Sequence, residues 1–368
     1  MNIIDLSLVN FKNYSEVSVE LHPKLNCFVG NNGMGKTNLL DAIYYLCMCK
    51  SYFNATDIYS IKQDSEFMVL QANFLQNQKE EEIYCGLKRN KKKQFRRNKK
   101  EYTKLSDHIG LFPVVMVSPS DIQLILDGSE ERRKYINSVI SQYNKNYLND
   151  IINYNKVLAQ RNKFLKDTQN SLQEQDLLDI LDEQLIKLGN AIYKERISFI
   201  EQYIPVFSEY YSKISGGTEP VELIYQSQLT ENDFADLLKQ SRSRDFAVQF
   251  TTTGIHKDDL VLNLNGTSIR KTGSQGQQKT FLVSLKFAQF KFLATIKKIL
   301  PLLLLDDVFD KLDSSRVKKI LELVADNSFG QIFITHTSLE KMQSILNELN
   351  IDHKLFRVDF GKIEEITN

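Results

Sequence analysis

The chain has 368 residues, 42% of them hydrophobic, which is enough for the core of one large domain or two smaller ones. Its formal net charge is +1, so overall charge does not indicate a polyanionic partner, and any nucleic-acid surface must come from local basic clusters. No apolar run approaches the ~18 residues of a membrane helix, and residues 1–20 lack the pattern of a signal peptide. The four cysteines have no metal-site spacing, so we expect reduced, buried thiols in a cytoplasmic protein.

The first part of the chain is rich in strand patterns. Residues 3–11 and 16–21 alternate between apolar and polar side chains, which predicts two strands. The apolar run 25–29 predicts a short buried strand, and further strands are predicted over residues 67–74 and 82–87.

A phosphate-binding motif follows the predicted strand 25–29. Residues 30–37 fit G-x-x-x-x-G-K-[ST], and a helical pattern begins directly after them, which argues against a chance glycine-rich turn. Glycines let backbone N–H groups point at phosphates, and the helix start adds partial positive charge there. Lys36 is expected to reach the β- and γ-phosphates of ATP, and the Thr37 hydroxyl to ligate Mg²⁺. The candidate nucleotide-binding residues are Gly30, Asn31, Asn32, Gly33, Met34, Gly35, Lys36, Thr37 and Asn38.

A strongly basic run covers residues 88–100, where nine of thirteen residues are Lys or Arg. It is either a hairpin that contacts DNA phosphates or a solvated hairpin tip. Phe95 alone is too little aromatic content for base stacking, so contact with DNA would be independent of sequence. The candidate DNA-binding residues are Lys88, Arg89, Lys91, Lys92, Lys93, Arg96, Arg97, Lys99 and Lys100.

The middle of the chain is predicted to be mainly helical. A buried strand at 114–117 precedes a helical zone, in which apolar side chains recur every three or four positions between residues 131 and 165. The polar segment 166–171 predicts a turn, and a second helix is expected to continue until Pro205. We interpret the apolar stripes as the packing faces of a helical hairpin.

Strands return after a break at residues 215–220. They are predicted over 221–225 and 260–264, with a hairpin turn at Asn265-Gly266 that leads into 268–270.

An apolar strand that ends in two carboxylates is predicted over residues 302–307. The carboxyl ends of buried parallel strands usually face the ligand, so Asp306 is expected to hold Mg²⁺ and Asp307 to polarise the attacking water. The later strand 332–336 ends in His336, which resembles the switch histidine that touches the γ-phosphate in ABC-type ATPases.

The segment 271–279 resembles the signature of ABC-type ATPases and precedes a predicted helix. Its Ser-x-Gly-Gln core consists of Ser274, Gln275, Gly276 and Gln277, of which Ser274, Gly276 and Gln277 are the candidate contacts to nucleotide. Leu312-Asp313 matches the D-loop of that class. In ABC-type ATPases the signature reaches the γ-phosphate held by a second subunit, and one copy of each motif is present here. The resemblance therefore implies an ATP-dependent homodimer with nucleotide shared across a two-fold interface.

The order and spacing of several segments resemble the RecF family of bacterial recombination and replication-gap repair proteins, relatives of the chromosome-maintenance ATPases. The segments are 4–14, 30–37, 117–121, 131–136, 158–162, 254–260 and 274–279. The resemblance implies a weak ATPase that dimerises around ATP on duplex or gapped DNA, works with RecO and RecR to load RecA, and is associated with the nucleoid.

The implied fold is α/β: an ABC-type P-loop ATPase head with an antiparallel β-subdomain, plus an inserted helical lobe in place of a long coiled coil. We expect residues 1–120 and 246–368 to form the head, and residues 121–245 to form the inserted lobe.

Two other functions remain open from the sequence. One is an ABC-type ATPase of a transporter, which the helical hairpin and the basic run disfavour. The other is an ATPase subunit of a nuclease, which needs a second acidic cluster, and Asp258-Asp259 is the spare pair. The chain also departs from the ABC pattern, because Asp307 replaces the usual Glu, Gln275-Gly276 replaces two glycines, and no Gln follows strand 114–117.

Overall fold

The computed structural model describes residues 1–167, 172–217, 219–309, 314–325, 328–349 and 351–366. The chain divides into two compact units. Unit 1 consists of Met1–Asp121, Lys213–Gly216 and Gln275–Asn368, and unit 2 of Ile122–Ser212 and Gly217–Ser274.

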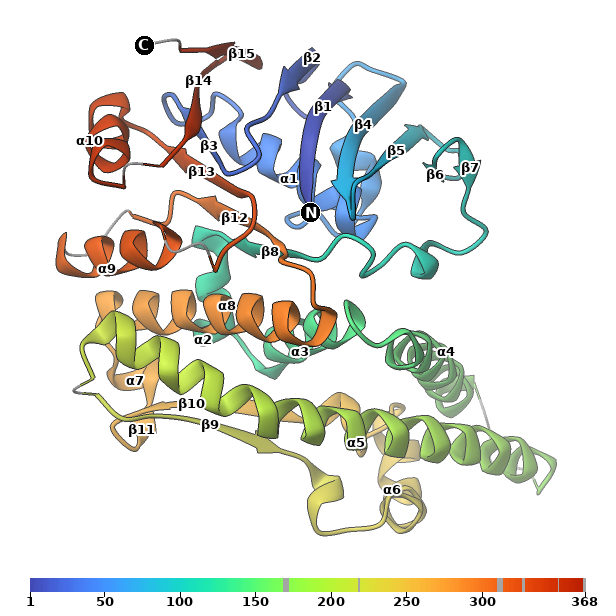
Figure 1. Cartoon of the computed structure of the whole chain (residues 1–368). Coiled ribbons are helices and arrows are strands. Elements are labelled where there is room, and N and C mark those ends of the chain that lie inside the picture. Colours follow the sequence, from blue (N-terminus) through green and yellow to red (C-terminus); the bar gives the residue numbers. More distant parts are fainter. Residues whose placement is uncertain (168–171, 218, 310–313, 326–327, 350, 367–368) are drawn as a thin grey trace. The chain divides into compact units, whose positions relative to one another are not determined.

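The first sheet of unit 1 is antiparallel, with strand order β2-β1-β4-β5-β6-β7 (Figure 1). Its strands are β1 (Asn2–Phe11), β2 (Tyr14–Glu20), β4 (Phe67–Gln76), β5 (Lys79–Lys88), β6 (Gln94–Arg97) and β7 (Lys100–Glu101). Side chains alternate between buried and solvent-facing along β4 and β5, as one-sided antiparallel sheets require. The four strands predicted from alternation in this region are confirmed.

The second sheet of unit 1 has the order β15-β14-β3-β13-β12-β8, and every pair in it is parallel except β14 with β15. Its strands are β3 (Leu25–Val29), β8 (Val114–Val117), β12 (Leu302–Asp306), β13 (Ile332–His336), β14 (His353–Asp359) and β15 (Lys362–Glu365). All residues of β3, β8, β12 and β13 are buried, which explains why these strands are continuous apolar runs rather than alternating ones.

Helix α1 (Lys36–Met48) occupies the core of unit 1 (Figure 1). Its buried side chains belong to one apolar cluster with side chains of both sheets, among them Leu70, Leu304 and Phe333. The helix is apolar on nearly every face, and this pattern is typical of a helix covered on all sides. Both sheets and the start of α1 are thereby fixed to each other.

Three further helices belong to unit 1: α8 (Gln275–Lys297), α9 (Ser314–Ala325) and α10 (Leu339–Leu349). Short 3-10 helices are η1 (Asp57–Ser60), η2 (Leu105–Asp107) and η3 (Pro119–Ile122), the last at the boundary between the units. The predicted D-loop residues Leu312 and Asp313 lie outside the described residues.

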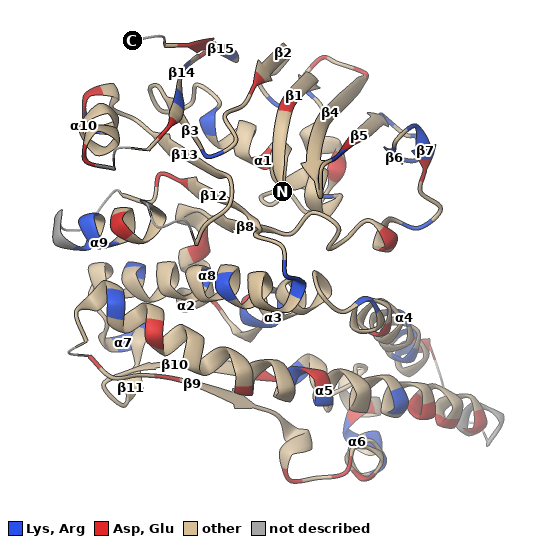
Figure 2. Ribbon diagram, in the orientation of Figure 1, with Lys and Arg blue, Asp and Glu red and all other residues tan. Residues whose placement is uncertain are grey.

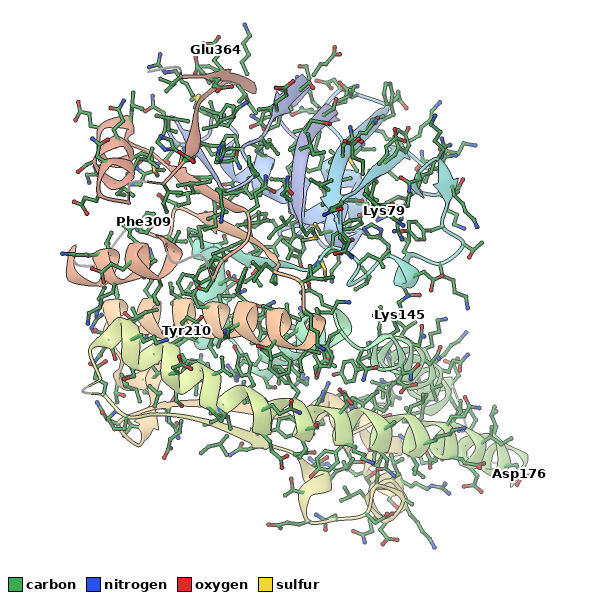
Figure 3. The ribbon with its side chains drawn as sticks, viewed as in Figure 1. Lys79, Lys145, Asp176, Tyr210, Phe309 and Glu364 are labelled. Carbon is green, nitrogen blue, oxygen red and sulfur yellow. The ribbon has the colours of Figure 1, made fainter. Side chains whose placement is uncertain are left out.

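Unit 2 is mainly helical and carries a three-stranded antiparallel sheet, β11-β10-β9. Its helices are α2 (Gln123–Leu126), α3 (Ser129–Ser141), α4 (Lys145–Asp167), α5 (Leu172–Ser215), α6 (Phe234–Val248) and α7 (Ile269–Thr272), with the last residues of α5 in unit 1. Its strands are β9 (Val221–Gln226), β10 (Asp259–Leu264) and β11 (Thr267–Ser268), and its 3-10 helices are η4 (Gln228–Thr230) and η5 (Ile255–Lys257). Figure 3 shows Lys145 at the start of α4 and Asp176 near the tip of the helical hairpin formed by α4 and α5.

The prediction that a helix ends at Pro205 is wrong, because α5 continues to Ser215. A proline in a helix interior removes one hydrogen bond and costs about 3 kcal/mol. Tyr203 and Phe207, which flank it, are fully buried, and the Tyr203 hydroxyl lies 2.6 Å from that of Tyr135. Burial of such side chains contributes about 1.5–3 kcal/mol each, which offsets the cost of the proline.

Two buried arginines bind the elements of unit 2 together. Arg161 of α4 forms ion pairs with Asp182 of α5 at 2.6 Å and with Asp245 of α6 at 2.7 Å. Arg196 of α5 pairs with Asp258 at 2.9 Å and donates to the Ile255 carbonyl at 2.8 Å. Both arginine side chains are themselves fully buried, so ionic contacts replace part of the apolar core.

Residues 246–274 stay with unit 2, whereas sequence analysis assigned them to the head. Strand β10 pairs with β9 along its whole length, from Asp259 opposite Gln226 to Leu264 opposite Val221. The strand expected over residues 268–270 is replaced at Ile269 by the short helix α7. The segment 166–171 falls largely outside the described residues.

The four cysteines, Cys27, Cys47, Cys49 and Cys85, are free and buried in unit 1, as expected. Burial raises the thiol pKa of all four, that of Cys49 to about 12. No described helix has the length and apolar character that crossing a membrane requires.

Candidate nucleotide site

The predicted nucleotide-binding residues meet at one edge of the parallel sheet in unit 1. Strand β13 lies between β3 and β12, with His336 opposite Val29 and Thr335 opposite Asp306. The carboxyl ends of all three strands therefore lie together, which is where α/β sheets bind ligands. The phosphate-binding loop leaves this edge after Val29 and leads into α1 at Lys36.

The loop is held open by glycines and by a side chain from outside it. Gly35 has φ +116°, and a Cβ there would lie 2.4 Å from Asn13 Nδ2, so no other residue fits. Asn13 Nδ2 donates to the Met34 carbonyl at 2.9 Å, and its Oδ1 accepts from Asn38 Nδ2 at 2.7 Å. Asn13 thus fixes both ends of the turn that orients the first N–H groups of α1.

Lys36 lies across the loop with only 7% of its surface exposed. Its Nζ donates to the carbonyls of Gly30 at 2.6 Å and Asn31 at 2.9 Å. Desolvation lowers the pKa of Lys36, while the charges of Asp307 and Asp306 raise it again. A phosphate beside this ammonium would favour the charged form.

Thr37 and Asp306 meet as the predicted metal ligands. The Thr37 hydroxyl lies 2.9 Å from each carboxylate oxygen of Asp306, and Thr335 Oγ1 donates to Asp306 Oδ1 at 2.8 Å. Burial raises the pKa of Asp306, and the hydrogen bonds from Thr335 and Thr37 lower it in part. One buried carboxylate and one hydroxyl next to a phosphate site fit Mg²⁺, which takes few protein oxygens and completes its shell with phosphate and water.

No cluster of three or more His, Cys, Asp or Glu side chains that could hold a metal occurs among the described residues. Thr37 and Asp306 supply one hydroxyl and one carboxylate, and Mg²⁺ in nucleotide sites is usually held by one or two carboxylates together with phosphates and water.

Asp307 and His336 border the same edge. Asp307 is half-buried, and its backbone has a φ of 48°, outside the range of a strand. Its N–H donates to Thr335 Oγ1 at 3.0 Å. The strand therefore ends at Asp306, and the side chain of Asp307 does not continue its alternation. His336 Nδ1 lies 2.8 Å from the Ser338 nitrogen and 3.1 Å from the Ser338 carbonyl oxygen, so whether it accepts or donates depends on the tautomer of the ring. Burial lowers the pKa of His336, and the hydrogen bond with Ser338 and the charge of Asp307 raise it in part.

A cavity of about 250 Å³ is lined by Lys36, Thr37, Asp306, Asp307 and Thr335 together with the loop and Pro119. Within the described part of unit 1, neither Gly276 nor Gln277 of the first turn of α8 lines it. Ser274 is the last residue of unit 2, exposed, and directly precedes α8. Its predicted contact with nucleotide remains a prediction.

Sequence analysis missed an ion pair beside this cavity. Asp121, two residues after Pro119, accepts from Lys286 Nζ of α8 at 3.0 Å and from the Tyr52 hydroxyl. It also accepts from the Ser118 N–H at 2.8 Å. The signal was Lys286, one of two lysines in the largely apolar run from Phe281 to Phe292, and the one that is buried. The pair ties α8 to the segment after β8.

Figure 2 marks the lysines and arginines of the basic run in blue around β6 and β7. Their side chains divide into internal and exposed ones. Lys93 is nearly buried and pairs with Asp57 at 2.7 Å, and Arg97 pairs with Glu81 at 2.7 Å. Arg89 Nε donates to the Ser65 carbonyl at 2.8 Å. The exposed cations are Lys88, Lys91, Lys92, Lys99 and Lys100, and Arg96 is half-buried beside Tyr84.

The spare acidic pair of unit 2 is engaged in structural ion pairs. Asp258 accepts from Arg196 and from the Tyr225 hydroxyl. Asp259 receives Arg132 Nε at 2.7 Å and Nη2 at 3.0 Å. Asp258 and Asp259 are therefore engaged in structural contacts, and the nuclease alternative has no support from this pair.

The comparisons with known proteins agree with this geometry. The family model of the RecF/RecN/SMC N-terminal domain matches residues 2–355. The DNA replication and repair protein RecF of Parabacteroides distasonis is 50% identical over 359 residues, which are 98% of each chain. The chain belongs to the RecF family. The RecF of Flavobacterium johnsoniae is 46% identical and covers 97% of this chain and 100% of its own.

Solved structures support the same family. A structure of the recombination mediator protein RecF with ATP, described as part of the RecFOR pathway, has a TM-score of 0.90 and 30% identity, and covers 100% of this chain and 98% of its own. An SMC head bound to the C-terminal winged-helix domain of ScpA has a TM-score of 0.59 at 17% identity, with 100% and 98% coverage. The second likeness concerns the fold alone and confirms the ABC-type ATPase head of this RecF-family chain.

Proposed function

We propose that this RecF-family protein binds and slowly hydrolyses ATP, dimerises around it, and acts on DNA in recombinational and replication-gap repair. Its relatives are named as DNA replication and repair proteins, and a solved relative holds ATP. The observation that carries the nucleotide part is the meeting of Thr37 and Asp306 at the end of the phosphate-binding loop.

Triphosphate binding would use the loop and Lys36. The N–H groups of the first turn of α1 have no partner within the helix, and the helix dipole favours anions at that end. Lys36 Nζ would exchange its loop carbonyl contacts for the β- and γ-phosphates. Thr37 and Asp306 would hold Mg²⁺, which when bound neutralises phosphate charge.

Hydrolysis would be served by Asp307 and His336. Asp307 lines the cavity just after the end of β12. From there its carboxylate would orient and polarise the attacking water. His336 would donate a hydrogen bond from Nε2 to the γ-phosphate. Aspartate is one methylene shorter than the usual glutamate, so its reach to the water is less favourable, and we expect a weak ATPase.

A second copy of the chain would complete each site. Ser274, Gly276 and Gln277 of one protomer would contact the γ-phosphate held by its partner, as the signature segment does in related ATPases. Ser274 is an exposed residue directly before the 23-residue helix α8, which supports this role. Hydrolysis would remove the bridging phosphate and let the protomers part.

DNA binding and partners follow from the family. The protein would bind duplex and gapped DNA without sequence preference through exposed lysines of the basic run, and would cooperate with RecO and RecR in loading RecA. Unit 1 would then be the ATPase head and unit 2 the inserted lobe. The protein would act in the cytoplasm, on the nucleoid.

Molecular mass with and without ATP tests the shared site. Wild-type protein should shift from monomer to dimer with ATP at micromolar concentration, and Lys36→Met should not. Ser274→Arg should bind ATP yet stay monomeric, because the larger cation blocks closure. Ser198→Arg, at an exposed serine of α5, is the matched control and should dimerise. The proposal fails if ATP leaves the wild-type protein monomeric and duplex DNA is not retained.

A further inference from the structure

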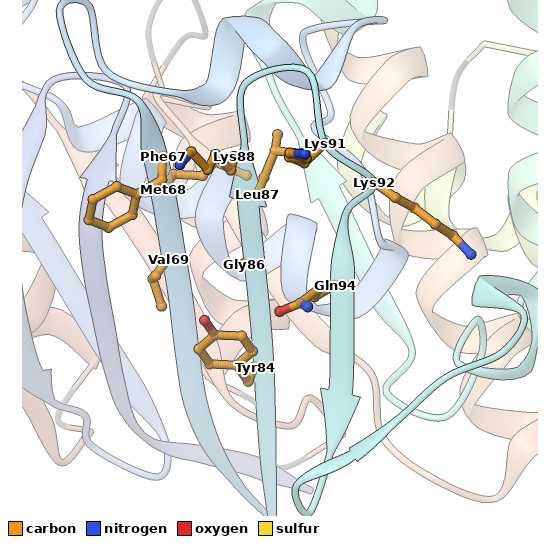
Figure 4. A pocket seen from close by; sticks show the side chains of 10 residues that line it. All are labelled: Phe67, Met68, Val69, Tyr84, Gly86, Leu87, Lys88, Lys91, Lys92 and Gln94. Atoms are coloured by element: carbon orange, nitrogen blue, oxygen red, sulfur yellow. The ribbon is translucent and has the colours of Figure 1, made fainter.

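The outward face of the antiparallel sheet carries an aromatic and basic groove near the basic run. Alternation along β4 and β5 buries Met68 and Leu87 and turns Phe67, Tyr84 and Lys88 away from the core (Figure 4). Phe67 is 45% exposed. It lines one cavity together with Tyr84 and Lys88, and an apolar patch rimmed by charged side chains is a candidate ligand site.

Gly86 makes the floor of this groove. A Cβ at Gly86 would lie 2.7 Å from the Tyr84 hydroxyl and 3.1 Å from its ring, so the ring lies along the strand over the glycine. Val69 stands opposite Gly86 on β4 and Gln94 opposite it on β6. The result is an open cavity of about 440 Å³ with Phe67 and Tyr84 in its walls, which lies within the size range of small-molecule sites.

The charge of the groove is uniformly positive. Lys88, Lys91 and Lys92 are exposed and line it, and among the described residues its lining includes no Asp or Glu. Arg96 does not line it but places its guanidinium 5.2 Å from the centroid of the Tyr84 ring. A ligand with a flat apolar group and several negative charges fits this combination.

Sequence analysis excluded base stacking here because Phe95 was the single aromatic residue of the basic run. Phe95 is indeed buried, with its ring 4.7 Å from that of His108. The aromatic side chains of the groove, Phe67 and Tyr84, come instead from β4 and from the middle of β5. They become neighbours of the lysines only when the sheet forms, so the run itself carried no sign of them.

We infer that this groove binds single-stranded DNA, with an unpaired base stacked on Tyr84 and the neighbouring phosphates held by Lys88, Lys91 and Lys92. Bases of a duplex are already stacked and paired, so their faces cannot enter such a groove, whereas unpaired bases can. Phe67 supplies a second apolar surface, and the Gln94 amide faces the base edge. This inference rests on the proposed DNA binding and adds to it a specific contact for the unpaired strand.

A tryptophan at position 84 would report the stacking directly, since the chain has none of its own. In Tyr84→Trp, a single-stranded thymidine oligonucleotide should quench tryptophan fluorescence, and an abasic oligonucleotide of equal length and a blunt duplex should not. Phe250→Trp is the matched control, an exposed ring with Lys257 Nζ at 5.0 Å but outside the groove, and should stay unquenched. Equal quenching at position 84 by the abasic strand or the duplex would overturn the inference.

Affinity gives a second readout that does not depend on the reporter. Tyr84→Ala should weaken single-stranded DNA binding about tenfold, and Tyr84→Phe should retain it, because stacking needs the ring and not the hydroxyl. Both variants should keep duplex binding and the ATP-dependent mass change, which separates failure of this inference from failure of the proposed function. If Tyr84→Ala binds single strands like wild type, the groove does not stack bases.

A glutamate-rich peptide that ends in phenylalanine tests the other ligand class with the same charge. It should neither quench the fluorescence of the Tyr84→Trp variant nor displace the oligonucleotide at equal concentration. Displacement with higher affinity than that of the oligonucleotide would assign the groove to an acidic protein segment and overturn the assignment to DNA.

Discussion

The phosphate-binding loop and the basic run, both in unit 1, were each predicted to contact phosphate, but they are built in opposite ways. At the loop, one lysine lies among glycines, and its geometry is fixed by backbone carbonyls and by Asn13. In the run, nine cations are present, yet Lys93 and Arg97 are engaged in pairs with Asp57 and Glu81. The number of positive charges in the run therefore overstates how many of its side chains are available to contact phosphate.

The largest effect is expected at the loop. Lys36→Ala removes a charge-assisted contact from a desolvated position, and should weaken ATP binding by about 2–3 kcal/mol, on the order of 100-fold. Calorimetric titration with ATP and Mg²⁺ measures it. Lys99→Ala, at an exposed lysine of the run, should bind ATP like wild type. Equal losses of ATP affinity in the two variants would mean that Lys36 acts only through its contribution to the net charge of the protein.

Next comes the internal lysine of the run. Lys93 Nζ contacts Asp57, the Tyr45 hydroxyl and the Cys49 carbonyl, so Lys93→Met should lower the free energy of unfolding by about 2 kcal/mol. The neighbouring variant Lys92→Met should cost less than about 0.5 kcal/mol. Urea unfolding followed by circular dichroism measures both. If Lys92→Met cost more stability than Lys93→Met, Lys93 would belong with the exposed lysines that are proposed to contact DNA.

The acid sensitivity of the region beneath the run is the third test. His108 is buried against Phe95, and desolvation lowers its pKa to about 4. Its contribution to stability is complete above the unfolded pKa of about 6.5 and is lost as pH falls toward 4, amounting to about 2 kcal/mol by pH 5. His108→Gln should show a correspondingly smaller loss of stability between pH 7.5 and pH 5. Parallel pH profiles would show that the pKa of His108 is the same in the folded and the unfolded protein.

The smallest effect concerns the exposed lysines. Lys91→Gln combined with Lys92→Gln should reduce the slope of log K against log salt for duplex DNA by about 2, because two phosphate contacts are lost. Lys93→Met should leave this slope unchanged. Fluorescence anisotropy over a salt series measures it, and an unchanged slope for the double variant would show that these lysines do not face DNA.

Motifs made by contiguous residues could be predicted from the sequence. The loop 30–37 and the strand ending at Asp306 are local patterns, and the rule that parallel strands present one common edge brought Thr37 and Asp306 together. Thr335 and Asn13 could not be found this way, because each contributes a single hydrogen-bonding side chain from a distant segment. Lys286 and Asp121 pair across 165 positions of sequence.

Other errors arose where packing overrode local preference. Pro205 should end a helix, but buried aromatic residues on both sides hold α5 together. The sequence assigned residues 246–274 to the second part of the ATPase head. Pairing of β10 with β9 keeps them in unit 2 instead. Within the basic run, the sequence could not separate Lys93 from Lys92, because the difference depends on Asp57, more than thirty positions earlier.

The burial of all four thiols bears on how the protein withstands the conditions that damage DNA. Peroxide attacks the thiolate form of solvent-accessible cysteine, and none of these sulfurs is exposed or readily ionised. Oxidants that break bases and strands should therefore leave these four thiols reduced.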